Sequence, residues 1–327
     1  SMLEKQKLLS PFGFFMLANV LLGTNIIAFK IATEGGMDPL FFTAMRFGLA
    51  GLIIIGFVWN YQALKNKRVL GGVIFNSLLL LASLVLWSYG LDQSTALKAA
   101  LLTLSIPLTV YVLSIVILKE KVNKKALVGC LIGLSGSLMI VGLPALGDGG
   151  IMIGDIMLLA AYSIAALTVV HTKYLYKWLK PSELVAFRFS VSGVIALIYI
   201  FISQGPVVLT GVSLEGWLAL IYGILLTGVV ANLLFFWALA KINGEDASPA
   251  FYADPLTGAL LAVVLLGDVL DIMATIGVAV VILGVTISHP YHHHTMYRMY
   301  IREHHYLHKV RLWLGNLIRH HHSHILK

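Results

Sequence analysis

The chain has 327 residues, of which 59% are hydrophobic and only 12% are charged, and its mean hydropathy is +0.90. Soluble domains are about 45–50% apolar and about 25% charged, so this composition excludes a soluble enzyme and indicates a membrane protein. The formal net charge is +8, and the single cysteine, Cys130, excludes an internal disulfide.

Apolar stretches of membrane-spanning length follow one another along almost the whole chain. A helix needs about 20 residues to cross a ~30 Å hydrocarbon layer. Ten such stretches lie at 12–32, 39–58, 70–91, 96–118, 126–143, 153–172, 182–203, 214–240, 247–266 and 271–288. We therefore expect an all-α integral membrane protein with ten transmembrane helices. Residues 1–11 form a short N-terminus, and the first stretch has no small-residue cleavage site, which favours a retained helix over a signal peptide.

Lysine and arginine are distributed unequally between alternate loops. One side carries 13 of them, and the other side carries Lys98 alone. The 13 are Lys5, Lys7, Lys65, Lys67, Arg68, Lys119, Lys121, Lys124, Lys125, Lys173, Lys177, Lys180 and Lys241. Positively charged loops stay in the cytoplasm, so we expect both termini there and the chain in the inner (plasma) membrane. The positive charge is then a topology signal, and no nucleic-acid partner is expected.

The ten stretches form two similar sets of five. Pro39 and Arg46 recur as Pro181 and Arg188 at an offset of 142. Pro107 recurs as Pro255 at an offset of 148, followed in both copies by an acidic helix end and two spaced glycines. Because five is an odd number, the second set must enter the membrane upside down relative to the first. We expect inverted repeats at 12–143 and 153–288, with a shared cavity near the midplane.

Three segments carry a resemblance to a known family. They are the run from Leu22 to Lys30, the spacing from Pro39 to Arg46, and the segment from Pro255 to Asp268. Together they resemble the EamA-type branch of the drug/metabolite transporter superfamily, over residues 12 to 288. One departure is Leu22, where the family often has tryptophan. The resemblance implies a ten-helix bundle that carries small metabolites or amino acids by alternating access, often outward.

Polar and aromatic side chains within the apolar stretches are candidates for binding substrate, because polar groups are costly in hydrocarbon. Asn76 and Trp87 share one face of the third stretch, and Trp237 is placed at the equivalent point of the eighth. Asn25 lies in the family-like run, and Tyr162 lies in the sixth stretch. The alternatives are interhelical hydrogen bonds for the asparagines and packing or interface positions for the tryptophans.

The fourth and ninth stretches each contain a proline, Pro107 and Pro255. A proline within a helix removes a backbone hydrogen bond and frees a carbonyl, so these residues are predicted hinges. The alternative is a static kink that only shapes packing.

Asp254 is an acid inside an apolar stretch, directly before Pro255 and close to Tyr252. An intramembrane carboxylate is a functional candidate that could bind an ammonium group or carry a proton, with Tyr252 beside it if Pro255 unwinds that turn. The alternatives are an ion pair with Arg46, Arg188 or Lys30, or a hydrogen bond within the helix.

Arg46 and Arg188 lie about two helical turns from the starts of their stretches. They are predicted to place positive charge at either mouth of the cavity, where they would attract carboxylates or phosphates. The alternative is that both side chains snorkel to nearby headgroups.

The tail at 289–327 differs in composition and contains 11 of the 12 histidines, interleaved with arginine, lysine and apolar residues. We expect a cytoplasmic amphipathic helix on the anionic inner leaflet, with metal sensing as a weaker alternative.

The sequence as a whole predicts a transporter that exports amino acids or related small metabolites. A nucleotide-type or other anionic metabolite exchanger is the alternative, and a metal-responsive regulator acting through the tail is a third. No catalytic set, resident metal or cofactor is expected. The expected partners are a small-molecule substrate and membrane lipids. The small-residue pair Gly129 and Gly133 predicts close helix packing, either within the subunit or with another copy in a homodimer.

Overall fold

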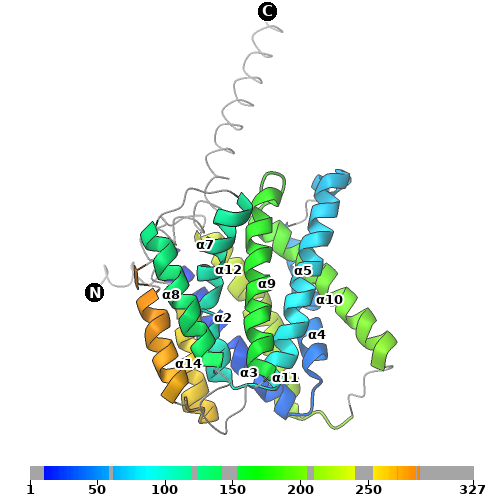
Figure 1. The fold of residues 1–327 in the computed structure, drawn as a ribbon. Coiled ribbons are helices and arrows are strands. Elements are labelled where there is room, and N and C mark those ends of the chain that lie inside the picture. Colours follow the sequence, from blue (N-terminus) through cyan, green and yellow to red (C-terminus); the bar gives the residue numbers. More distant parts are fainter. Residues whose placement is uncertain are drawn as a thin grey trace, which may run out of the picture.

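The computed structural model describes residues 11–58, 62–118, 124–141, 153–204, 210–239, 253–270, 272–284 and 286–287 (Figure 1). All regular structure within these ranges is helical. The predicted tail, the first ten residues and Tyr252 lie outside the described residues.

The helices of the first half are α2 (Pro11–Gly23), α3 (Asn25–Glu34), α4 (Pro39–Val58), α5 (Lys67–Asp92), α6 (Ala96–Leu102), α7 (Ser105–Leu118) and α8 (Lys124–Val141). Those of the second half are α9 (Ile153–Leu175), α10 (Pro181–Gln204), α11 (Leu214–Tyr222), the π-helix η2 (Gly223–Val230), α12 (Ala231–Leu239), α14 (Ala253–Leu266) and a helix at Ile272–Gly284. A short 3-10 turn, η1 (Ala63–Lys65), precedes α5.

Six helical segments in the described part of the chain are long and apolar enough to cross a membrane, and four further apolar helices are shorter. The six are Pro11–Glu34, Pro39–Phe57, Lys67–Asp92, Ile153–Thr172, Pro181–Ser203 and Leu214–Ala238. Large apolar side chains are exposed along the bundle, among them Leu52, Phe201 and Val264. Water would not tolerate so much apolar surface, whereas lipid does. The architecture is therefore that of a multi-helix membrane protein.

Local sequence signals mark the helix ends. Proline is the first residue of α4 and of α10, where its missing N–H costs nothing. The side chains of Asn66, Thr95 and Ser213 accept a hydrogen bond from the first turn of α5, α6 and α11.

The helix bounds repeat at the offsets of the sequence motifs or within one residue of them. The starts of α2 and α4 correspond to those of α9 and α10 at the offset of 142 that relates Pro39 to Pro181. Both ends of α5 match those of the continuous segment Leu214–Leu239 at an offset of 147, and both ends of α7 match those of α14 at an offset of 148. These helices of the first half therefore have counterparts in the second.

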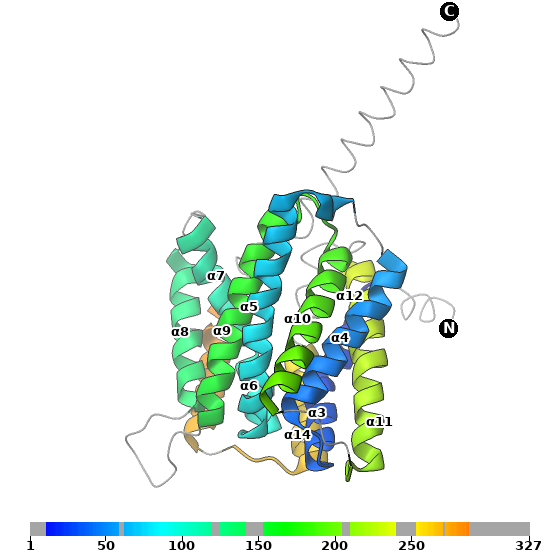
Figure 2. The ribbon, with the colours of Figure 1, turned by 90° about the vertical axis from the view of Figure 1, so that its right-hand side faces the viewer.

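Two equivalent glycine contacts at the crossing of α4 and α10 relate the halves by a pseudo-twofold axis. Gly48 packs on Gly193 and Gly51 on Ser190, where α4 and α10 run side by side (Figure 2). By the offset between α4 and α10, Gly193 is the counterpart of Gly51 and Ser190 that of Gly48, so the two contacts are the same contact made twice. The halves thus pack on equivalent surfaces.

The helix Ile272–Gly284 runs beside α8 (Figure 1). Gly284 packs on Gly129 and Gly133, and Gly136 packs on Gly277 and Val281. The predicted small-residue pair on α8 is therefore used within the subunit, where it brings two helix backbones together.

The described lysine-rich links lie at one end of the bundle, at the top of Figure 2, where α4 leads to α5 and α9 leads to α10. We call this the lysine-rich end. At the opposite end, the backbone N–H of Ser213 donates to the carbonyl of Gly35 at 2.8 Å and joins the link before α4 to the link before α11. Gly36 and Gly211 adopt positive φ angles of 88° and 99° in these two links, a conformation that suits glycine.

Candidate functional site

The first transmembrane helix, Pro11–Glu34, has a local distortion in its middle, which we call the interruption. Helix α2 ends at Gly23 and α3 begins at Asn25, with Thr24 between them. The Thr24 hydroxyl donates to the carbonyl of Leu21 at 2.6 Å and lies 2.7 Å from the hydroxyl of Tyr222. Gly23 packs so closely on the backbone of Asp254 that a Cβ would collide with it. The interruption therefore faces α14 on one side and the end of α11 on the other.

The eighth helix widens into the π-helix η2 at the same level, whereas its counterpart α5 is α-helical throughout. The Thr227 hydroxyl lies 2.9 Å from the carbonyl of Gly223. The Asn232 amide donates to the carbonyls of Thr227 and Gly228 at 3.0 and 2.9 Å. These side chains satisfy carbonyls along the widened turns, and π segments of this kind often occur at functional sites.

Arg46 projects from α4 against η2 and is only 5% exposed. Its Nε donates to the hydroxyl of Thr227 at 3.1 Å, and its guanidinium lies 4.4 Å from the centre of the Phe47 ring. Gly223 has no Cβ and leaves room for the Arg46 side chain. The alternative that Arg46 snorkels to nearby headgroups is wrong, because the side chain is held inside the bundle, and its place at a cavity mouth stays a prediction.

Asn25 and Asp254 complete this polar group. Asn25 is 8% exposed, and its Oδ1 lies 3.4 Å from the Thr227 hydroxyl. Asp254, half-buried in the first turn of α14, interacts electrostatically with Arg46. Three elements, α3, α4 and η2, thus bring together Asn25, Arg46 and Thr227, and α14 adds Asp254 within electrostatic range of Arg46. We call these four residues the polar site.

The counterpart of the polar site in the other half is almost entirely apolar. At the offsets of the helix bounds, the equivalents of Asn25, Thr227 and Asp254 are Leu167, Leu80 and Ile106. Arg188 remains as the counterpart of Arg46, half-buried over the Phe189 ring at 5.6 Å. The rings of Phe47 and Phe189 meet edge to face at 4.6 Å, so the two Arg–Phe pairs join at the pseudo-twofold axis. At these equivalent positions, only one half supplies a carboxylate and an amide beside its arginine.

Tyr162 and Trp87 lie together at the centre of the molecule. The Tyr162 hydroxyl donates to the carbonyl of Ala99 at 2.8 Å and interacts with the side chains of Trp87 and Thr103. It is also within electrostatic range of Asp254. The Trp87 ring meets Phe29 at a centroid distance of 5.0 Å. These two predicted residues therefore border the same central region as the polar site.

Asn76 does not join that region. Its amide nitrogen lies 3.1 Å from both the carbonyl of Thr168 and Nδ1 of His171 and so links α5 to α9. Its Oδ1 has no hydrogen-bond partner in the part of the chain that the structure describes. Ser83, on the same face of α5, donates to the carbonyl of Ala161 at 2.9 Å. This face of α5 packs on α9. Asn76 therefore makes an interhelical hydrogen bond, which is the alternative to substrate binding given above for the asparagines.

Trp237 is not the counterpart of Trp87. The offset between α5 and the eighth helix pairs Trp87 with Leu234. Trp237 is 43% exposed and packs edge to face on Phe14 at 5.3 Å. The predicted symmetric pair of tryptophans is therefore wrong.

The two prolines lie at equivalent positions. Pro107 and Pro255 are each the third residue of a helix, in α7 and α14. In the first half, the regular helix changes at Thr103 and Leu104, between α6 and α7, where the N–H groups of Leu104 and Ile106 donate to carbonyls three residues before them. The N–H that Pro107 lacks would have bonded to the carbonyl of Thr103, so the proline explains why the helix breaks there.

Thr227 was not predicted, because a single threonine in a long apolar run carries no sequence signal. No group of three His, Cys, Asp or Glu side chains suited to a metal lies among the described residues. The polar site contains a guanidinium, a carboxylate, an amide and a hydroxyl, and these groups can bind charged organic molecules.

Comparison with known proteins agrees with this architecture. "Uncharacterized transporter YoaV" of Bacillus subtilis is 26% identical over 80% of this chain and 91% of that protein. An uncharacterized transporter of Clostridium kluyveri is 23% identical over 84% of this chain and 92% of that protein. A solved crystal structure that is 18% identical matches the fold with a TM-score of 0.58, over 85% of this chain and 96% of that one. The EamA-like transporter family matches residues 10–142 and again 152–288, and the chain belongs to this family of membrane transporters.

Proposed function

We propose that this membrane transporter carries amino acids or closely related small metabolites, bound at the polar site, by alternating access. The ten apolar helices would act as two inverted five-helix repeats that rock about the α4–α10 crossing. Export is the proposed direction because the resemblance to EamA-type transporters implies it. The excess of lysine and arginine in alternate loops supports cytoplasmic termini and a location in the inner membrane.

The observation that carries the proposal is a buried arginine with a carboxylate within electrostatic range, at the level where two helices are irregular. Arg46 is positioned by Thr227, and Asp254 lies at the start of α14, next to the interruption of the first helix. Charged groups within a membrane are costly and generally serve function. An amino acid presents a carboxylate to a guanidinium and an ammonium group to a carboxylate, so it matches both charges at once.

The alternative, exchange of nucleotides or other anionic metabolites, is supported by the two arginines Arg46 and Arg188. Asp254 weighs against it, because a negative charge within electrostatic range of Arg46 repels a phosphate. The two possibilities differ in how they respond to Asp254→Asn. Loss of the carboxylate should weaken the binding of an amino acid and strengthen the binding of an anion.

The test is exchange in proteoliposomes that contain the purified protein and are preloaded with unlabelled amino acids. Entry of labelled amino acid should be competed by zwitterionic amino acids and not by nucleotides, dicarboxylates or organic cations. Arg46→Gln should lower the exchange rate at least about tenfold, since a hydrogen bond to a charged group is worth about 1.5–3 kcal/mol.

The matched control is Arg68→Gln, which removes an exposed arginine at the start of α5 and should leave exchange unchanged. Exchange of phosphorylated metabolites in place of amino acids, enhanced in Asp254→Asn, would establish the anionic alternative.

A further inference from the structure

The short helix α6 is a separate unit at the end of the bundle opposite the lysine-rich end. It has seven residues and is followed by the interruption at Thr103 and Leu104. The proline that causes this interruption, Pro107, prevents the helix from continuing without a break. The junction at Thr103 and Leu104 is the point about which α6 would move relative to α7.

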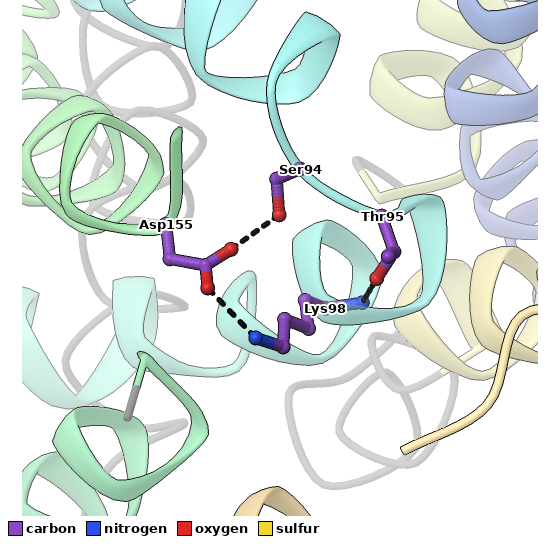
Figure 3. A network of polar contacts seen from close by, with 4 residues as sticks. All are labelled: Ser94, Thr95, Lys98 and Asp155. Atoms are coloured by element: carbon purple, nitrogen blue, oxygen red, sulfur yellow. Dashed lines mark hydrogen bonds and ion pairs between the residues drawn. The ribbon is translucent and has the colours of Figure 1, made fainter. Parts of the chain in front are cut away.

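An ion pair fastens the start of α6 to α9 (Figure 3). Lys98 Nζ lies 2.8 Å from Asp155 Oδ2, and the Ser94 hydroxyl donates to Asp155 Oδ1. The Asp155 side chain is completely buried, and that of Lys98 is 13% exposed. Each carboxylate oxygen of Asp155 thus has one partner, and the two partners, Ser94 and Lys98, lie just before α6 and in its first turn. We call Ser94, Lys98 and Asp155 the latch.

Further contacts bring the same short segment against the remaining helices of this end. Lys30 of α3 donates to the carbonyl of Ser94 at 2.6 Å. Asp268, just after α14, accepts from the N–H of Leu97 at 2.9 Å. The first turn of α6 therefore contacts the first, sixth and ninth transmembrane helices together.

Helix α6 also contacts the central region. Tyr162 of α9 donates to the carbonyl of Ala99, next to Lys98 in the chain. Gly258 of α14 packs on Ala100, and without a Cβ it also approaches the carbonyl of Gly23 at the interruption of the first helix. A movement of α6 would therefore disturb the aromatic residues and helix ends that border the polar site.

The latch belongs to one half only. The offset between α2 and α9 makes Gly13 the counterpart of Asp155. A glycine has no carboxylate, so the equivalent position near the lysine-rich end lacks the acid on which the latch is built. The latch is therefore not repeated at the lysine-rich end.

We propose that α6 is the gate at the end opposite the lysine-rich loops and that the latch holds it shut. This inference rests on the proposed transport function only because transport gives the gate a reason to open. The ion pair of the latch is present in the structure whatever the protein transports. Removing one partner leaves the other charge buried without compensation, which favours the open arrangement. Exchanging the two charges restores the pair.

The test measures how readily a thiol on α6 reacts from outside intact cells. Cys130 is first replaced by alanine, and Ala99→Cys, at a completely buried position, serves as the reporter for a membrane-impermeant maleimide. In Asp155→Asn the labelling rate should rise by about fivefold or more over the parent. The charge exchange Lys98→Asp with Asp155→Lys should return the rate to within about twofold of the parent.

Two controls accompany the test. Leu214→Cys, 70% exposed at the same end, should label in every background and shows that this end faces the reagent. Glu215→Gln removes an exposed carboxylate of that end and should leave labelling of the reporter unchanged. Elution as a single peak in size-exclusion chromatography identifies the variants that are folded.

Unchanged labelling in Asp155→Asn, or a charge-exchanged variant that labels as fast as the single variant, would overturn the latch. The readout requires no substrate. A latch that behaves as expected in a protein without amino acid exchange would therefore refute the proposed substrate class and leave the gate standing.

Discussion

At the scale of single residues, Thr227 connects two parts of the polar site. Its hydroxyl accepts from Arg46 Nε at 3.1 Å, and its one proton can go to Gly223 at 2.9 Å or to Asn25 at 3.4 Å. The shorter distance favours Gly223, so the hydroxyl oxygen remains directed at the guanidinium. Thr227 thus sets where the Arg46 charge lies in the membrane.

Thr227→Val removes the acceptor for Arg46 and keeps the volume and β-branching of the side chain. We expect the KM for exchange to rise about tenfold, because a buried hydrogen bond to a charged group is lost. Thr227→Ser keeps the hydroxyl and should stay within about twofold of the parent. Measured exchange curves distinguish the two, and equal values for valine and serine would show that the hydroxyl does not position Arg46.

At the scale of elements, close helix packing depends on glycines at defined crossings. Gly193 lies against the backbone of Gly48, where α4 and α10 cross on the pseudo-twofold axis. Gly56, farther along α4, has no atom within 4 Å of the position that a Cβ would occupy. The same residue type is therefore essential at one position and replaceable at the other.

Gly193→Ala should force α4 and α10 apart and lower the Tm of the detergent-solubilised protein by several degrees, since a Cβ meets backbone that cannot give way. Gly56→Ala is the matched control and should leave the Tm unchanged or slightly higher, because alanine favours helix. Thermal unfolding followed by size-exclusion chromatography measures both. Equal stabilities would contradict the close crossing.

At the scale of the whole molecule, the duplicated helix bounds and the lysine distribution together specify an orientation. The links that contain Lys65 and Lys177 lie at one end, and those that contain Gly36 and Gly211 lie at the other. Positively charged links remain in the cytoplasm, which assigns the first end to the inside.

In the Cys130→Ala background, Lys177→Cys should react with an impermeant maleimide only after the cells are permeabilised. Leu214→Cys should react in intact cells, because the inverted arrangement places the start of α11 outside. The measurement is the fraction labelled before and after permeabilisation. Labelling of both positions in intact cells would contradict the arrangement of ten spans with cytoplasmic termini.

Much of the architecture could be predicted from the sequence, because spanning helices are long apolar runs that satisfy their own hydrogen bonds. The family, the membrane character and the repeat offsets follow from such patterns. The contacts that individual polar side chains make do not follow from such patterns. Asn76 and Asn25 are both amides in apolar helices, yet one links α5 to α9 and the other lies beside Arg46.

The sequence by itself determined the class of protein, the family and the internal duplication, since hydropathy and motif spacing are properties of the chain alone. Only the tertiary structure decided that Arg46 is buried against a π-helix, that Trp87 and Trp237 are not counterparts, and that Asp155 fastens α6. These outcomes depend on which helix faces which, and on one widened segment in η2 that shifts the side chains after it. Such contacts join residues that are 57 to 202 positions apart in the chain, and no local sequence pattern encodes which residues meet over such a separation.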